Sequence, residues 1–171
     1  VYKRQLKDAG LTAQDIDAIF FATVSPDQVM PSTACVLQSK LGAKNCMAVD
    51  ISAACSGFVY ALSIADQFIK VGTYKHVLVI GAEVLHKYVN YKDRETCILF
   101  GDGAGAMVAS RAEDGDKNHI MSHHLHADGD IGDLFVLPAG GSKMPFTQEV
   151  LDSGAHFVRM KGREIFKHAV R

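Results

Sequence analysis

Cys55 is the residue of this chain whose surroundings best suit covalent chemistry. It follows a short apolar run, 47–51, and lies among small residues, 52–57, just before a helical pattern. The first backbone N–H groups of a helix lack partners and carry partial positive charge, so they stabilise a thiolate and can bind a thioester oxygen. The plainer alternative is a buried structural cysteine that fills space beside two alanines. The succession of strand, small loop and helix favours the nucleophile.

The helix after Cys55 is predicted to be buried on most sides. Nearly every residue from 58 to 71 is apolar, and a helix with so little polar surface packs on most of its faces. Its few polar residues form one narrow stripe: Ser63, Asp66, Gln67 and Lys70.

A glycine-rich stretch at residues 101–106 fits the pattern G-x-G-x-x-A. A dinucleotide site would need a helix next and an acidic residue about 20 positions on. Residues 107–111 are instead short and strand-like, and residues 120–127 contain no acid. We therefore reject nicotinamide dinucleotide binding and expect these glycines to allow close backbone packing.

Four histidines lie close together in the sequence: His119, His123, His124 and His126. In a strand, His124 and His126 would share one face. A metal site needs three or four converging ligands, and the spacing indicates no third one. We expect a polar surface strand here and no metal site.

The remaining periodicity predicts an α/β protein. A continuous apolar run at 18–24 reads as a strand covered on both faces, and 76–82 reads as another. Ser32 is a candidate N-cap for a helix that ends before Gly42, and Gly10 is a candidate end for an N-terminal helix.

Composition excludes several classes of protein. The chain has 171 residues, 22% of them charged, and a net charge of −1, so no bulk attraction to nucleic acid or membrane is expected. It has no apolar run of transmembrane length and no signal-peptide pattern, so we expect a cytoplasmic protein. No CxxC spacing is present, and Cys35, Cys46 and Cys97 are expected to be core residues.

Several separate motifs resemble β-ketoacyl-ACP synthase III, the initiating condensing enzyme of type II fatty acid synthesis, which has the thiolase fold. They are residues 31–35 (PSTAC), 50–58 (DISAACSGF), 81–83 (GAE), 93–97 (DRETC), 99–106 (LFGDGAGA), 138–142 (PAGGS) and 160–167 (MKGREIFK). The resemblance implies an α/β, thiolase-like chain, layered αβαβα in the intact family. Here it implies mainly the N-terminal half, with a mixed sheet and a buried central helix.

The same resemblance implies how the chain is divided. Residues 1–155 would be the N-terminal half, incomplete at its start, with its connecting loops, and 156–171 the beginning of the C-terminal half. Because both ends fall within helical patterns, we expect a fragment. We also expect the strand at 18–24 to be exposed for want of sheet neighbours.

The resemblance assigns roles to individual residues. Cys55 would be the catalytic nucleophile, and Lys167 would dock acidic carrier protein. Five residues would contact the substrate or coenzyme A: Arg94, Met30, Phe100, Gly162 and Phe166. Without the resemblance, Arg94 is read as an exposed loop arginine and Met30 as a loop methionine. Phe100 and Phe166 are read as core residues, Gly162 as a helix-start glycine and Lys167 as a solvated lysine.

The implied reaction joins an acyl-CoA primer, expected to be acetyl-CoA, to malonyl-ACP with loss of CO₂, through an acyl-Cys55 intermediate. The product would be a 3-oxoacyl-ACP. The enzyme would be a homodimer without a cofactor, with acyl carrier protein as partner. The family's His and Asn motifs, H-Q-A-N and G-N-T-S, are absent, so we predict that this chain alone does not condense. The alternatives are another thiolase-fold condensing enzyme, of the HMG-CoA synthase, polyketide or alkylquinolone type, and a catalytically silent fragment.

Overall fold

The computed structural model describes residues 1–170, which form two compact units. The first comprises residues 1–83 and 103–125, and the second comprises 84–102 and the chain from 126 onward. The predicted division at residue 155 concerns the halves of the family's chain and stays a prediction.

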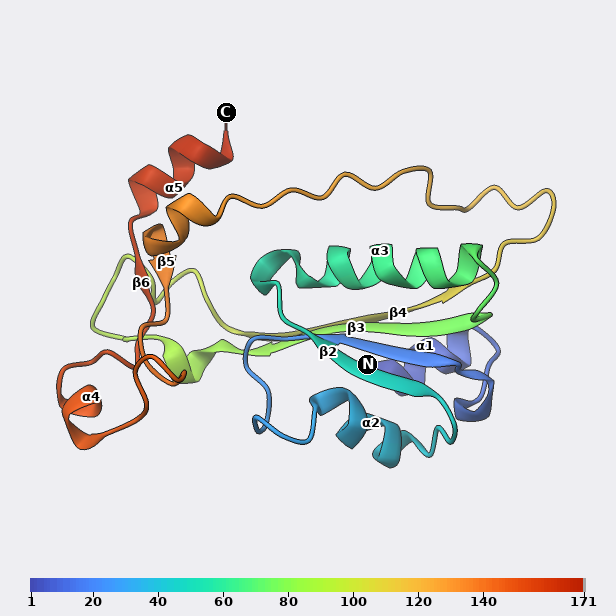
Figure 1. Cartoon of the computed structure of the whole chain (residues 1–171), viewed down its shortest axis with the longest axis horizontal. Helices are drawn as coiled ribbons and strands as arrows, with labels where there is room; N and C mark the ends of the chain where they lie inside the picture. The colour runs from blue at the N-terminus through green and yellow to red at the C-terminus, as the bar shows by residue number, and fades with distance from the viewer. Residues whose placement is uncertain (171) are drawn as a thin grey trace. The chain divides into compact units, whose positions relative to one another are not determined.

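The first unit is built on a four-stranded sheet of order β2-β1-β3-β4 (Figure 1). The strands are β1 (Ala18–Ala22), β2 (Met47–Ile51), β3 (His76–Val84) and β4 (Asp102–Ser110). Strand β1 pairs in parallel with β2 on one side and β3 on the other. The α/β prediction is confirmed.

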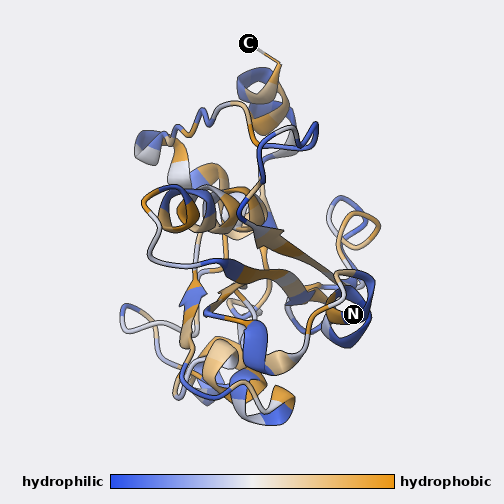
Figure 2. Cartoon of the chain, turned by 90° about the vertical axis from the view of Figure 1, so that its right-hand side faces the viewer, coloured by the Kyte–Doolittle hydropathy of each residue, from blue (hydrophilic) through white to orange (hydrophobic). Residues whose placement is uncertain are grey.

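Helices cover both faces of this sheet. Residues on alternate sides of β1 point to opposite faces, so Ile19 packs with α1 (Tyr2–Asp8) and α2 (Thr33–Leu41), whereas Phe20 packs with α3 (Gly57–Lys70). In Figure 2 the central strands have the orange colour of hydrophobic residues. Sequence patterning thus produces three layers.

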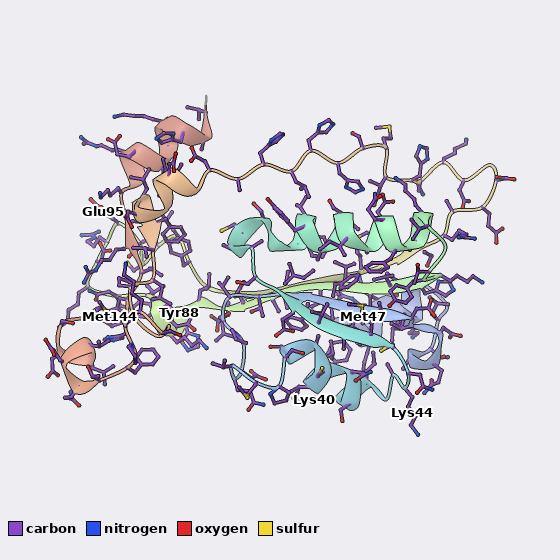
Figure 3. All side chains as sticks on the ribbon, viewed as in Figure 1. Lys40, Lys44, Met47, Tyr88, Glu95 and Met144 are labelled. Atoms are coloured by element: carbon purple, nitrogen blue, oxygen red, sulfur yellow. The ribbon has the colours of Figure 1, made fainter. Side chains whose placement is uncertain are left out.

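Strand exposure differs from two expectations. Strand β1 is almost completely buried, because both its edges are paired, so the expectation that it would be exposed is wrong. Strand β2, predicted as buried, is only half-buried at the edge of the sheet; Figure 3 labels Met47 there.

The local end signals of the helices are confirmed. Helix α2 begins after Ser32, whose Oγ accepts a hydrogen bond from the Cys35 backbone N–H, and ends at Gly42 in the left-handed conformation. Gly10 likewise has a positive φ of 67° after α1. Thr12 and Asp15 form a capping box around a 3-10 turn, Ala13–Asp15.

Helix α3 is less buried than its composition suggested. Ala61, Ala65 and Ile69 face the sheet and are buried, but Val59 and Ile64 are exposed. Within the polar stripe, Ser63 and Asp66 are buried and Gln67 and Lys70 are exposed. Residues packed over α3 therefore decide which part of the stripe meets water.

The second unit holds shorter elements. Strands β5 (Phe135–Val136) and β6 (Arg159–Met160) pair antiparallel, and Ala139, Val150 and Ala155 form a small core. The remaining elements are two 3-10 turns, Leu85–Tyr88 and Gly129–Leu134, with helices α4 (Gln148–Asp152) and α5 (Gly162–Ala169).

Three further expectations are corrected. Residues 119–126 form no strand in the described chain, and Cys35 is exposed on α2, although Cys46 is buried as expected. The glycines of 101–106 lie in or just before β4, and a Cβ added at Gly101, Gly103 or Gly105 would meet nothing within 4 Å. Close packing therefore does not explain them, although the strand agrees with the rejection of a dinucleotide site.

Candidate active site

Cys55 lies where β2 turns into α3. It is the middle residue of a 3-10 turn, Ala54–Ser56, which runs directly into the helix, and it is exposed. The predicted succession of strand, turn and helix around Cys55 is confirmed. The alternative of a buried, space-filling cysteine is wrong.

The residue before Cys55 has an unusual backbone conformation. Ala54 has a φ of 45°, in the left-handed region that residues with a Cβ seldom adopt. Such conformations cost free energy and cluster at functional sites. The turn therefore sets the direction of Cys55 at the expense of local stability.

Two glycines bring the start of α3 close to the sheet. A Cβ at Gly57 would lie 3.1 Å from the Cβ of Ala22 at the end of β1, and one at Gly81 on β3 would lie 3.3 Å from the Phe58 ring. Cys55 is thereby placed at the carboxyl ends of the parallel strands, the edge where α/β sheets bind ligands.

Neither the turn nor α3 has a capping side chain hydrogen-bonded at its start. The backbone N–H groups of Ser56 and Gly57 donate to the carbonyls of Ala53 and Ala54 within the turn. The partial positive charge at the start of the helix still favours an anion there. This arrangement suits a thiolate and a thioester oxygen.

Two carboxylates that sequence reasoning missed fix the loop between β1 and α2. Glu83, on β3, accepts hydrogen bonds from the Val24 backbone N–H at 3.0 Å and from the hydroxyls of Thr23 and Ser25. Glu83 and Thr23 are 60 positions apart in the sequence, so no local sequence pattern predicts these contacts.

Asp50, on β2, binds the other end of the same loop. It accepts hydrogen bonds at 2.7 Å from the backbone N–H groups of Thr33 and Ala34, the first residues of α2. Between the carboxylates, Val29 and Met30 protrude and are 91% and 79% exposed. Met30 is therefore accessible at the surface of this unit, and its predicted role stays a prediction.

The other predicted site residues lie in the second unit. Arg94 is exposed in a loop; the Phe100 ring stacks on Phe135 with centroids 5.3 Å apart. Gly162 begins α5, and Phe166 is 67% exposed rather than a core residue. Lys167 pairs with Glu164 at 3.0 Å. Their proposed contacts with substrate or carrier protein stay predictions.

A His–Asp pair also lies in the second unit. The backbone N–H of His86 donates to Asp102 Oδ1 at 3.1 Å, and the His86 ring lies 2.6 Å from Oδ2. These contacts, the backbone one first, lower the pKa of Asp102. Both side chains are exposed.

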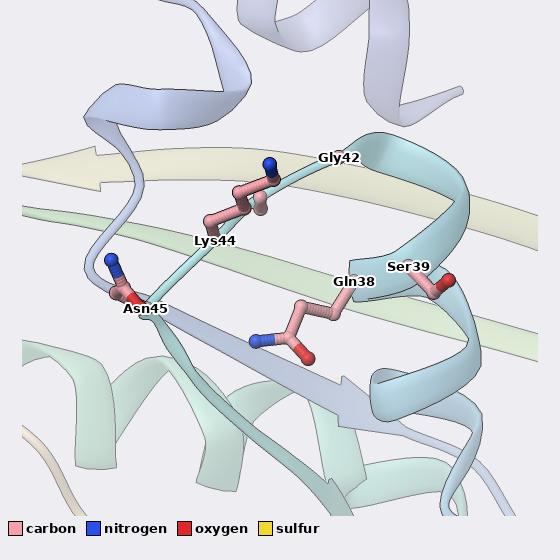
Figure 4. A pocket seen from close by; sticks show the side chains of 6 residues that line it. Gln38, Ser39, Gly42, Lys44 and Asn45 are labelled. Carbon is pink, nitrogen blue, oxygen red and sulfur yellow. The ribbon is translucent and has the colours of Figure 1, made fainter.

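A shallow hollow of about 420 Å³ lies beside the end of α2 (Figure 4). Its lining residues are Gln38, Ser39, Gly42, Ala43, Lys44 and Asn45. These residues precede β2, whereas Cys55 follows it, so the hollow lies at the opposite end of β2 from Cys55.

Two searches of residues 1–170 gave no candidates. No three His, Cys, Asp or Glu side chains converge there in an arrangement that could hold a metal ion. None of the helices described is both long and apolar enough to cross a membrane.

Comparison with known proteins agrees with the fold and the cysteine turn. Residues 49–129 match the family model of 3-oxoacyl-[acyl-carrier-protein] synthase III. A β-ketoacyl-[acyl-carrier-protein] synthase III from Caldanaerobacter subterraneus is 53% identical over 169 residues, which are 99% of this chain and 50% of that protein.

Solved structures give the same result. The 3-oxoacyl-[acyl-carrier-protein] synthase III of Aquifex aeolicus superposes with a TM-score of 0.83 at 46% identity, over 98% of this chain and 49% of that one. The priming β-ketosynthase of the R1128 polyketide pathway superposes with a TM-score of 0.82 at 27% identity, over 99% and 49%.

The sheet, the cysteine turn and these superpositions define a thiolase-like fold. The chain is similar to β-ketoacyl-ACP synthase III in sequence and fold over nearly its whole length, and it spans about half the length of the curated relatives it matches.

Proposed function

We propose that this chain provides the acyl-accepting half of an acyltransferase that starts fatty acid synthesis. The observation that carries the proposal is the exposed Cys55 on a strained turn, at an uncapped helix start and at the carboxyl edge of the sheet. The family and the curated relatives support this choice of reaction.

In the first half-reaction, the Cys55 thiolate attacks the carbonyl carbon of an acyl-CoA, with acetyl-CoA as the expected primer. The new S–C bond forms as the bond to the coenzyme A sulfur breaks, and that thiol leaves. The positive end of the α3 dipole, which lies at this turn, stabilises the negative charge on the carbonyl oxygen.

In the second half-reaction, malonyl-ACP loses CO₂, and the resulting enolate attacks the acyl-cysteine. This step releases 3-oxoacyl-ACP and regenerates the Cys55 thiolate. Hydrogen-bond donors to the enolate oxygen are needed, and none of the eight histidines of this chain lies in the family's motif. We therefore assign only the first half-reaction to residues of this chain.

The other predicted residues receive supporting roles in this proposal. Arg94 binds the nucleotide end of coenzyme A, Phe100 and Phe166 border the substrate channel with Gly162, and Lys167 faces acyl carrier protein. Met30 reaches a second copy in a homodimer, for which its 79% exposure is a requirement. The protein works without a cofactor, in the cytoplasm.

The similarity to a priming ketosynthase of a polyketide pathway favours a second candidate, condensation in polyketide synthesis. The two candidates share Cys55 and differ in the second substrate. Because this chain alone is not expected to condense, binding is compared: the acylated protein is presented with malonyl-ACP from fatty acid synthesis and then with malonyl-CoA, and the substrate that it retains distinguishes the candidates.

Labelling with radioactive acetyl-CoA tests the proposal. We expect the wild-type chain to become labelled and the Cys55→Ala variant to remain unlabelled. Cys35→Ala is the matched control, because Cys35 is also exposed but lies within a capped helix. Intact mass on the same sample, from a starting mass of 18.5 kDa, must rise by one acetyl group. Equal labelling of both variants would overturn the assignment of Cys55.

A further inference from the structure

The segment between β4 and residue 125, which we call the strap (residues 111–125), runs along α3 within the first unit (Figure 1). It forms no helix or strand in the described chain. Its recorded backbone hydrogen bonds lie near its start, from Arg111 to Lys75 and within a turn from Asp116 to Glu113. Side chains must therefore hold its later part in place.

His123 is the principal polar attachment of that later part. Its Nε2 lies 2.7 Å from Asp66 Oδ2, and its Nδ1 lies 2.8 Å from Ser63 Oγ. Ser63 and Asp66 belong to α3 and are only 6% and 8% exposed. A neutral imidazole fits both contacts if Nε2–H donates to the carboxylate and the serine hydroxyl donates to Nδ1.

Asp66, whose carboxylate contacts His123, has two further hydrogen-bond donors close by. Asp66 Oδ2 also lies 2.7 Å from Lys70 Nζ and 3.2 Å from Gln67 Nε2. Burial raises the pKa of Asp66, but the hydrogen bonds from Lys70 and His123 outweigh it and lower the pKa overall. Asp66 is therefore ionised at neutral pH, and its bond to His123 is charge-assisted.

The trio of serine, histidine and aspartate is not a hydrolytic site. Ser63 is almost completely buried in the middle of α3, where backbone N–H groups are already used by the helix. An acyl group could neither reach its Oγ nor find donors for an oxyanion there. The trio instead joins the strap to the helix.

We propose that the strap is a conformational element that opens from α3 while the sheet stays folded, with His123 as its latch. Arg111 is the fixed end, because its guanidinium also donates to the Ile69 carbonyl at the end of α3, at 3.3 Å. Apart from His123, only Ile120 and Leu125 of the strap are partly buried, so few other contacts oppose opening. Opening exposes Ser63 and Asp66 on α3.

Native-state proteolysis with thermolysin tests the latch. The enzyme cuts before bulky apolar residues, and cleavage before Leu125 requires the adjoining His123 to leave α3. When opening is fast, the cleavage rate follows the population of the open form. Variants on α3 leave the cut sequence unchanged, so their rates compare directly.

We expect Asp66→Ala to be cut about tenfold or more faster than wild type, since a hydrogen bond to a charged group is lost. Ser63→Ala should be cut about twofold to tenfold faster, because a neutral hydrogen bond is lost. Alanine has a higher helix propensity than serine, so faster cutting would not result from a weakened α3. Lys70→Ala is the matched control: it removes the lysine partner of Asp66 but leaves the latch, so its rate should stay close to that of wild type.

Thermal unfolding of each variant separates the latch from a general loss of stability. The proposal is supported if cleavage at Leu125 accelerates while the unfolding transition of the sheet persists. It is overturned if Ser63→Ala and Asp66→Ala are cut no faster than wild type, or if cleavage occurs only at the rate of global unfolding. Neither result depends on acylation of Cys55.

Discussion

Helices α2 and α3 flank the same edge strand, β2, but their N-termini are built in opposite ways. At α2, Ser32 and Asp50 together accept hydrogen bonds from three backbone N–H groups, and the carboxylate brings a negative charge to the dipole. At α3, no side chain caps the helix, and a strained turn presents the exposed Cys55.

The difference shows two uses of one physical feature. A capped N-terminus stabilises the fold, because its orphan donors are satisfied and its charge is balanced. At α3 no carboxylate balances the helix dipole, so its positive end stays available to an anionic ligand, at a cost in stability. Asp50 lies only five positions before Cys55 in the sequence, yet its carboxylate serves the other helix. The following predictions test this division.

The largest expected effect is on chemistry at α3. Cys55→Ala should abolish acylation by acetyl-CoA and leave the free energy of unfolding within about 0.5 kcal/mol, because the side chain is exposed. Labelling and denaturant unfolding of the same sample measure both quantities. A large loss of stability would contradict a cysteine kept for reaction.

At α2, the largest effect should be on stability. Asp50→Ala orphans two N–H groups that share a charged acceptor, so we expect about 1–3 kcal/mol of destabilisation by denaturant unfolding. Ser32→Ala removes a single neutral contact and should cost about 1 kcal/mol. Equal costs for the two variants would show that the Asp50 charge is unimportant.

Gly57→Ala should disturb the start of α3 by steric contact. The added methyl would meet the Ala22 Cβ at 3.1 Å, so we expect a cost of about 1–3 kcal/mol together with slower acylation. Gly103→Ala in β4 is the control, since its Cβ would meet nothing within 4 Å. Unchanged acylation in Gly57→Ala would show that this close approach does not position Cys55.

Acid should weaken α3 through Asp66. Its pKa is lowered in the folded protein, so its contribution is complete above the ordinary carboxyl pKa of about 3.9 and is lost as pH falls through the lowered value. We expect Asp66→Asn to be less stable than wild type at neutral pH, and we expect this difference in stability to narrow as the pH falls below about 3.9. Urea unfolding at several pH values measures this; a constant gap would contradict it.

The smallest expected effect comes from the strained turn. Ala54→Gly should stabilise the chain by up to about 1 kcal/mol, because glycine adopts a positive φ without the Cβ penalty. Acylation should not become faster, since the looser turn holds Cys55 less well. Denaturant midpoints and labelling rates report the two changes. A destabilised variant would show that φ at residue 54 carries no strain.

Features that depend on near neighbours in the chain could be predicted from the sequence. The Ser32 cap and the Gly42 terminus of α2 involve residues within about one helical turn. The alternation within β1 and the turn at Cys55 are also local patterns. They were sufficient to predict the layers of the first unit and the position of Cys55 between strand and helix.

Contacts between distant residues could not be read in this way. Glu83 and Thr23 are 60 positions apart, and His123 and Asp66 are 57 apart. At such separations, no local sequence pattern indicates which polar residues will be partners. The sequence therefore placed Asp66 in a narrow polar stripe and His123 in a surface strand, with no contact between them. The sequence by itself determined the helices, the central strands and the turn that holds Cys55, because local periodicity and capping encode them. Only the tertiary structure decided which carboxylates cap, anchor or latch, because those roles arise when packing removes water and brings donors from distant parts of the chain to one carboxylate.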